Sequence, residues 1–389
     1  MGVDNVDVRI SDIVNGVNVI SGSDAGSPDP YDYRGKCIEL FTEHYINITS
    51  RSSDGAYWAP AGRPADYYMG WVPDALIPFA APQGLGGAPF GIPANQNQGV
   101  WVDIYIPRHA APGTYTGTID ITVNGSTSNT IPINLDVYDF TLSDETHTPS
   151  FSSAYGNEMM ARHGFTVPWE QYYNKVKRYY QMAHRHRFDF AYTASSVAGL
   201  EIYKEYISGE AYTPAYGYEG PGEGLGLRIF HQYNMPTEWG GWPPGSWTEE
   251  TWRQGTDMWI NWFTANAPAT AMYKLLYPDE PSPADYPLIV QQGDWDRGNP
   301  GPGRNVVTMT TRHIVPEIKG HVDAWCEAMQ ATRPGRTNVA EVRAEQAAGV
   351  KFGVYNGYRA ASGTVVIDTD ATDFRTEGVP VVWTGIMAS

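Results

Sequence analysis

The first 145 residues of the chain alternate apolar and polar positions with a period of two. From Tyr115 to Val123 apolar residues and Gly alternate with Thr and Asp, the pattern of a strand with one buried face. Asn124 and Gly125 follow, and the alternation returns from Ile131 to Val137, so the two segments predict a β-hairpin. A third strand is predicted from Val100 to Ile106. Residues 1–145 are therefore expected to form an antiparallel β-sandwich domain.

From about residue 147 short apolar runs alternate with segments of helical spacing. One helix is predicted from about Trp169 to Arg187, with cationic residues at its end. A second helix is predicted behind a capping box of Ser246 and Glu249, with Trp252, Trp259 and Trp262 on one face. A third is expected to begin at Asn338 and to end at Gly349. The predicted strands are Pro149–Ala154, Phe188–Tyr192, Leu227–Tyr233, Met272–Tyr277, Asn305–Thr311, His321–Cys326 and Val350–Tyr355.

This alternation predicts a (β/α)₈ TIM-type barrel over residues 146–389. The eighth strand would be the terminal segment Val379–Ser389, an apolar run that stops without a following helix. The barrel is therefore expected to close on that segment or to be incomplete at its C-terminal end.

The composition of the chain excludes several classes of ligand and binding partner. The chain has 389 residues and a formal charge of −17, so binding to nucleic acid is not expected. No apolar run is long enough to span a membrane, and the N-terminus carries no basic and apolar leader. Two cysteines exclude a disulfide scaffold, and no histidine spacing indicates a metal. No cofactor and no catalytic metal are expected. The 13 Trp and 26 Tyr residues suit either large aromatic cores or stacking on sugar rings.

In a barrel of this type the chemistry lies just after the C-terminal ends of the strands. Carboxylates, amides and aromatic residues recur at those positions and Lys does not, which suits a neutral polyhydroxylated ligand better than a phosphate. The candidate substrate-binding residues at these positions are Tyr155, Asp189, Tyr192, Asp323, Trp325, Tyr355 and Asn356.

The sharpest local feature is the adjacent pair Asp279 and Glu280, held between Pro278 and Pro281 at the end of an apolar run. Glycoside hydrolysis requires a carboxylic acid that protonates the leaving oxygen and a second group that stabilises the cationic centre. Adjacent acids are too close in sequence to flank a glycosidic bond, but they suit a mechanism in which the sugar's 2-acetamido oxygen attacks. The alternative is structural, with Asp279 capping the next helix and Glu280 favouring its dipole.

Several segments resemble glycoside hydrolase family 123, the β-N-acetylgalactosaminidase family. Gly70–Pro78, Val100–Pro107 and Pro112–Gly117 are similar to segments of that family's first domain, and Val137–Leu142 resembles the exit toward the barrel. In the barrel region Tyr277–Pro281 matches the family's Asp-Glu segment. Val322–Trp325 and Tyr355–Gly357 resemble later strand ends.

The resemblance implies a substrate-assisted retaining hydrolase of a β-linked N-acetylhexosamine. Glu280 would be the general acid/base, Asp279 would orient the acetamido group, and Tyr355 and Trp325 would contact the substrate. It also favours a secreted or periplasmic location. Two alternatives remain: a glycosidase of other specificity that pairs Glu280 with a distant Asp189, Asp323 or Glu158, and a catalytically silent carbohydrate-binding or structural protein. The sequence leaves the oligomeric state open.

Overall fold

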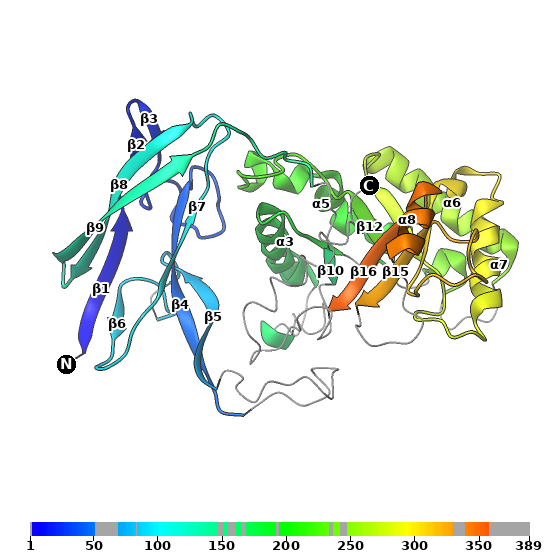
Figure 1. Cartoon of the computed structure of the whole chain (residues 1–389), viewed down its shortest axis with the longest axis horizontal. Helices are drawn as coiled ribbons and strands as arrows, with labels where there is room; N and C mark the ends of the chain where they lie inside the picture. Colours follow the sequence, from blue (N-terminus) through cyan, green and yellow to red (C-terminus); the bar gives the residue numbers. More distant parts are fainter. Residues whose placement is uncertain are drawn as a thin grey trace.

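The structure is a computed structural model of the whole chain. It describes residues 2–50, 69–82, 84–146, 151–153, 161–164, 169–191, 194–232, 236–241, 247–329 and 339–357. Within these segments no helix combines the length and the apolar character needed to cross a bilayer. Antiparallel strands occupy the N-terminal part, and parallel strands with helices occupy the C-terminal part (Figure 1).

The larger N-terminal sheet is antiparallel and runs in the order β3-β2-β8-β1-β6, with β9 paired to β8. The predicted hairpin is confirmed: Val123 pairs with Ser126 across Asn124 and Gly125, whose φ angles are +50° and +79°. Two successive left-handed residues are what a tight hairpin turn requires. The strands are β1 (Val3–Ile10), β2 (Ile13–Asn15), β3 (Asn18–Ile20), β6 (Phe90–Ile92), β8 (Gly113–Val123) and β9 (Ser126–Val137).

A smaller antiparallel sheet places β4 (Ile38–Ile48) between β5 (Gly70–Pro78) and β7 (Val100–Ile104), so the predicted strand at 100–106 is present. Ile38 and Leu40 from this sheet pack in one cluster with Val8, Ile10 and Tyr115 from the larger sheet. The two N-terminal sheets therefore share a hydrophobic core.

The seven strands predicted in the second half are all present, and their pairing is parallel. β10 (Phe151–Ser153) pairs with β11 (Asp189–Ala191), and five further strands follow one another in chain order. The complete barrel expected from the sequence is not established: the described strands form two separate parallel sheets, of two and five strands. The expected terminal strand lies outside the described residues. The five strands are β12 (Ile229–Gln232), β13 (Ala271–Leu275), β14 (Val307–Thr310), β15 (Ala324–Met329) and β16 (Lys351–Gly357).

The helices of this part include α3 (Trp169–Arg185), α6 (Glu249–Asn266), α7 (Tyr286–Arg297) and α8 (Val339–Ala347), with the short α4 (Val197–Leu200) and α5 (Lys204–Ser208). As predicted, α6 buries its tryptophans in the core. The predicted capping residues were wrong: Thr248 caps α6 and exchanges hydrogen bonds with Thr251, and Ser246 lies outside the described residues. Glu249 is already helical, so it cannot be the distal member of that box.

Arg185 at the end of α3 links the N-terminal and C-terminal parts. Its guanidinium pairs with Glu39 of β4 at 3.3 Å and donates to the carbonyl of Lys36 at 3.1 Å and to that of Glu219 at 2.5 Å. It also lies 4.8 Å from the ring centre of Tyr33. The sequence explained this cation by the helix dipole alone, whereas its contacts connect residues almost 150 positions apart. The division into domains at residue 145 stays a prediction.

Candidate active site

The loop after β13 carries the two adjacent acids, and a buried side chain of α7 bonds to the backbone at the start of this loop. Gln292 of α7 is fully buried; its Nε2 donates to the Tyr277 carbonyl at 2.6 Å, and its Oε1 accepts from the Tyr277 N–H at 2.9 Å. Buried backbone groups need partners, and one amide here supplies both. Asp279 and Glu280 follow as exposed residues. The backbone that precedes the two acids is therefore fixed at Tyr277 by Gln292.

One hydroxyl joins the two acids. Thr311 directly follows β14; its Oγ1 accepts from the Glu280 N–H at 2.6 Å and donates to Asp279 Oδ1 at 2.5 Å. Glu280 has φ of +48°, a left-handed conformation that costs on the order of 1–3 kcal/mol for a residue with a Cβ. The bond from its N–H to Thr311 helps to hold that conformation. The carboxyl ends of two neighbouring strands thus fix the position of both acids.

Tyr355 of β16 contacts the second acid, because its hydroxyl donates to Glu280 Oε1. Burial raises the pKa of Tyr355, and the negative charges of Glu280 and Asp279 raise it further. The phenol therefore keeps its proton and remains a hydrogen-bond donor to Glu280. The structure thus brings Tyr355 into contact with Glu280, and a contact of Tyr355 with substrate stays a prediction.

Two half-buried side chains lie near Asp279 on the inner face of the sheet. Burial lowers the pKa of His231 on β12 to about 4, against an opposing effect of the Asp279 charge. Burial raises the pKa of Cys326 on β15 to about 12, and Asp279 acts in the same direction. At neutral pH the histidine is uncharged and the cysteine is a thiol. These two side chains therefore provide no positive charge to compensate the Asp279 carboxylate.

The arrangement provides two carboxyl groups, a phenol and a threonine hydroxyl at one edge of a parallel sheet. No group of three or more His, Cys, Asp or Glu side chains in the described segments is placed to hold a metal ion. A pair of acids with a phenol can move a proton and stabilise a developing positive charge. The purely structural alternative is not supported for Asp279, because Asp279 is not the residue that caps α7, whose N-cap is Asp285.

Two predicted site residues on β15 are placed elsewhere. Trp325 is 1% exposed in the helix-side core, and its indole N–H donates to Glu345 of α8 at 3.1 Å. Its neighbours Ala324 and Cys326 face the opposite side. Asp323 precedes the strand, accepting from the Thr308 N–H at 3.0 Å and pairing with Arg297. The strand begins at residue 324, so Asp323 lies at its amino end, and Trp325 packs on the helix side. A contact of either residue with a substrate at Glu280 is therefore not supported.

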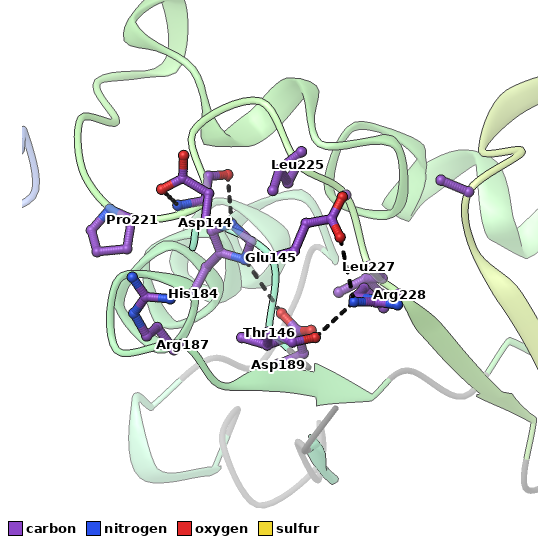
Figure 2. A pocket seen from close by; sticks show the side chains of 13 residues that line it. Asp144, Glu145, Thr146, His184, Arg187, Asp189, Pro221, Leu225, Leu227 and Arg228 are labelled. Carbon is purple, nitrogen blue, oxygen red and sulfur yellow. Dashed lines mark hydrogen bonds and ion pairs between the residues drawn. The ribbon is translucent and has the colours of Figure 1, made fainter. Parts of the chain in front are cut away.

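Asp189 lies at the amino end of its strand, whereas Asp279 and Glu280 follow the carboxyl end of theirs. It begins β11 and accepts from His184 Nδ1 at 3.3 Å. Together with Arg187, Arg228 and Glu145 it lines a cavity of about 210 Å³ (Figure 2). The cavity lies at the amino ends of β11–β13, since Arg228 directly precedes β12. A contact between Asp189 and a substrate at Glu280 is therefore not supported.

The remaining candidates are less defined. Tyr155 and Tyr192 lie outside the described residues, and Asn356 is described only by its place in β16. The sequence missed Thr311, Gln292 and His231. A signal existed for Thr311, because it was the last residue of a predicted strand and so occupied the same edge as Asp279. Nothing local marked Gln292, a helical amide fifteen residues beyond the Tyr277 backbone that it holds.

Residues 78–123 match the family model described as the glycoside hydrolase 123 N-terminal domain. The match includes Val100–Pro107 and Pro112–Gly117, two of the segments on which the sequence resemblance was based. The chain resembles glycoside hydrolase family 123. No curated protein matches its sequence.

The family 123 likeness extends to the fold. A family 123 glycoside hydrolase from Clostridium perfringens is similar at a TM-score of 0.59 and 15% identity, covering 94% of this chain and 65% of that one. This chain thus spans about two thirds of the length of that hydrolase. An FMN-binding β-glucuronidase from Faecalibacterium prausnitzii matches at a TM-score of 0.30 and 10% identity, over 93% of this chain and 51% of that one. A TM-score that low does not establish a common fold.

Proposed function

We propose that this chain is a glycoside hydrolase that cleaves a β-linked N-acetylhexosamine, of the N-acetylgalactosamine type, with retention of configuration. The observation that carries the proposal is the Thr311 hydroxyl, which donates to the Asp279 carboxylate and accepts from the Glu280 backbone N–H at the carboxyl edge of a parallel sheet. The likeness to family 123 supports the glycosidase class. The substrate-assisted mechanism rests on the chemistry of the paired acids, and the N-acetylgalactosamine-type sugar rests on the resemblance to family 123.

Two carboxyl groups that flank a glycosidic bond lie about 5–5.5 Å apart in retaining enzymes and about 6.5–9.5 Å apart in inverting enzymes. Asp279 and Glu280 are instead adjacent in the chain, and the Thr311 hydroxyl bonds to the Asp279 carboxylate and to the Glu280 backbone N–H. In the proposed reaction the acetamido oxygen attacks C1 while the glycosidic C1–O bond breaks, and Glu280 gives its proton to the leaving oxygen. A water oxygen then bonds to C1 while the C1–O bond to the acetamido oxygen breaks, and that water gives one proton to Glu280, which restores both the acetamido group and the acid. Asp279 holds the acetamido N–H and stabilises its developing positive charge.

The second described group in contact with Glu280 is Tyr355, whose donated hydrogen bond fixes the carboxyl in one orientation. The alternative that uses a distant second carboxylate loses two of its candidates, because Asp189 and Asp323 lie at the amino ends of their strands. Glu158, the third, lies outside the described residues.

The test compares 4-nitrophenyl N-acetyl-β-galactosaminide with 4-nitrophenyl β-galactoside. We expect hydrolysis of the first only, and inhibition by a thiazoline that mimics the cyclised intermediate. Glu280→Gln should nearly abolish cleavage of an oligosaccharide but spare the aryl glycoside, since a good leaving group needs little protonation. Asp279→Asn should slow both by about 10²–10⁴-fold. Glu250→Gln, an exposed change on α6, is the matched control and should be silent.

Efficient hydrolysis of the 2-hydroxy galactoside by the wild type would refute substrate assistance and favour two distant carboxylates. Binding of N-acetylhexosaminides without any turnover would refute the hydrolase and favour the silent carbohydrate-binding protein. Equal loss on both substrates in Glu280→Gln would contradict its role as proton donor.

A further inference from the structure

A second cavity lies in the N-terminal sheets, away from the edge that carries Asp279 and Glu280. Its volume is about 680 Å³, within the range of about 300–1,000 Å³ typical of small-molecule sites. It is bounded by the middle of β4, both ends of β5, strand β6 and the loop 93–98. These elements come from both N-terminal sheets.

Aromatic and apolar side chains form part of the lining. Trp71 on β5 is 65% exposed, an unusual degree of exposure for a tryptophan within a strand. Tyr45 on β4 is half-buried, and its hydroxyl donates to Glu43 Oε2 at 2.9 Å. Between Glu43 and Tyr45 the pairing with β5 shifts by one residue. Such bulges bend a strand and re-aim its side chains, which is consistent with a cavity at this point.

The opposite wall is a run of four amides, Asn95 to Gln98. Gln98 holds this loop against the sheet, since its Nε2 donates to the Glu43 carbonyl at 2.8 Å and to the Gly99 carbonyl at 2.9 Å. Asn95 to Asn97 are exposed. An amide side chain both donates and accepts hydrogen bonds, so a run of them suits a ligand with many hydroxyl groups.

The charge of the lining restricts the ligand further. Glu43 is the one carboxylate among the described lining residues, and these residues include neither Lys nor Arg. An anionic ligand such as a phosphate or sulfate would meet the Glu43 carboxylate, with His44 as the one basic side chain among the described lining residues and without the Lys or Arg typical of anion sites. A wholly apolar ligand would leave the amides without partners, which is costly. The remaining class is neutral and polyhydroxylated, with an apolar face for the aromatic rings.

We propose that this cavity binds a neutral oligosaccharide and is distinct from the carboxylate pair. The apolar face of a sugar ring packs on the Trp71 indole. Its hydroxyls bond with the amide loop, and Glu43 accepts from neighbouring hydroxyls. A glycan held here would raise the local concentration of its other branches around the same protein.

The experiment measures binding of the full chain to a printed array of neutral tetra- to hexasaccharides, each beside its sialylated or sulfated counterpart. We expect retention on neutral members only. Isothermal titration with the best-retained neutral oligosaccharide should then show affinity weakened about tenfold or more in Trp71→Ala, since an aromatic contact contributes on the order of one decade. Asn97→Ala, an exposed change on the loop, should also weaken binding.

Trp101→Ala is the matched control, because Trp101 is 48% exposed on the same small sheet and does not line the cavity. It should bind as the wild type does, and so should Glu280→Gln. Wild-type affinity in both Trp71→Ala and Asn97→Ala would overturn the proposal, as would no retention on any neutral member or a preference for the sulfated ones. Loss of binding in Glu280→Gln would assign the binding to the carboxylate pair instead.

Discussion

Thr311 provides a direct test of the candidate active site, because its hydroxyl bonds to the Asp279 carboxylate and to the Glu280 backbone N–H. Thr311→Val keeps the shape of the side chain and removes the hydroxyl. The change deletes the acceptor for the Glu280 N–H and the donor to Asp279. Thr311→Ser keeps the hydroxyl and is the matched control.

The size of the effect follows from the two bonds. A neutral hydrogen bond contributes about 0.5–1.5 kcal/mol net, and one to a charged group about 1.5–3 kcal/mol. Both bonds are solvent-exposed in the free protein, so water replaces part of each. We therefore expect a loss of about 1.4–2.8 kcal/mol in transition-state stabilisation, that is, a 10- to 100-fold lower kcat/KM.

The assay is steady-state hydrolysis of 4-nitrophenyl N-acetyl-β-galactosaminide, with thermal unfolding measured in parallel. Thr311→Ser should retain most of the activity, and Tm should change little in either variant because the hydroxyl lies at the surface. A Thr311→Val enzyme within about threefold of the wild type would refute the reasoning, since positioning of the acids would then not depend on the bridge.

Three further predictions concern buried and half-buried polar groups of the C-terminal part. Gln292→Leu should lower the free energy of unfolding by about 2–4 kcal/mol in urea titrations, because the Tyr277 N–H and carbonyl both lose a partner; an unchanged midpoint would contradict this. Lys274 and Asp296 form a buried ion pair. Lys274→Met should lower the free energy of unfolding by about 3–5 kcal/mol, because Asp296 then remains as a buried charge without its partner. A Lys274→Met, Asp296→Leu double variant should recover most of that loss. Because the pKa of His231 is about 4 when folded and about 6.5 when unfolded, the unfolded chain alone takes up this proton as pH falls from 6.5 to 4. Stability should therefore fall over that window by up to about 3 kcal/mol more in the wild type than in His231→Gln; equal slopes in denaturation at pH 7, 5.5 and 4 would exclude the effect.

The sequence by itself determined those features that depend on neighbours in the chain. The hairpin at Asn124–Gly125 follows from a turn that needs two left-handed residues between alternating segments. The seven parallel strands were found because each is an apolar run bounded by turn residues. Asp279 and Glu280 were placed at a strand end for the same reason, since the run before them stops at a proline.

Tertiary structure decided which end and which face of a strand each side chain occupies. The run at 321–326 was read as a strand, but β15 begins at residue 324, so Asp323 moved from the carboxyl end to the amino end. Trp325 was assigned to the pocket, yet it packs against α8. Both faces of this sheet carry buried apolar residues, so an apolar run does not distinguish the inner face from the helix-covered face.

The contacts that fix the acids are likewise tertiary. Thr311 lies 31 residues from Glu280, and Tyr355 lies 75 residues from it. Arg185 pairs with Glu39, which lies 146 residues earlier in the chain. No local pattern encodes such pairs, because parallel strands are joined through helices and their ends meet only after the sheet has formed. The local sequence thus determines that the two acids follow the end of a strand. Only the folded sheet brings the Thr311 hydroxyl and the Tyr355 phenol into contact with them.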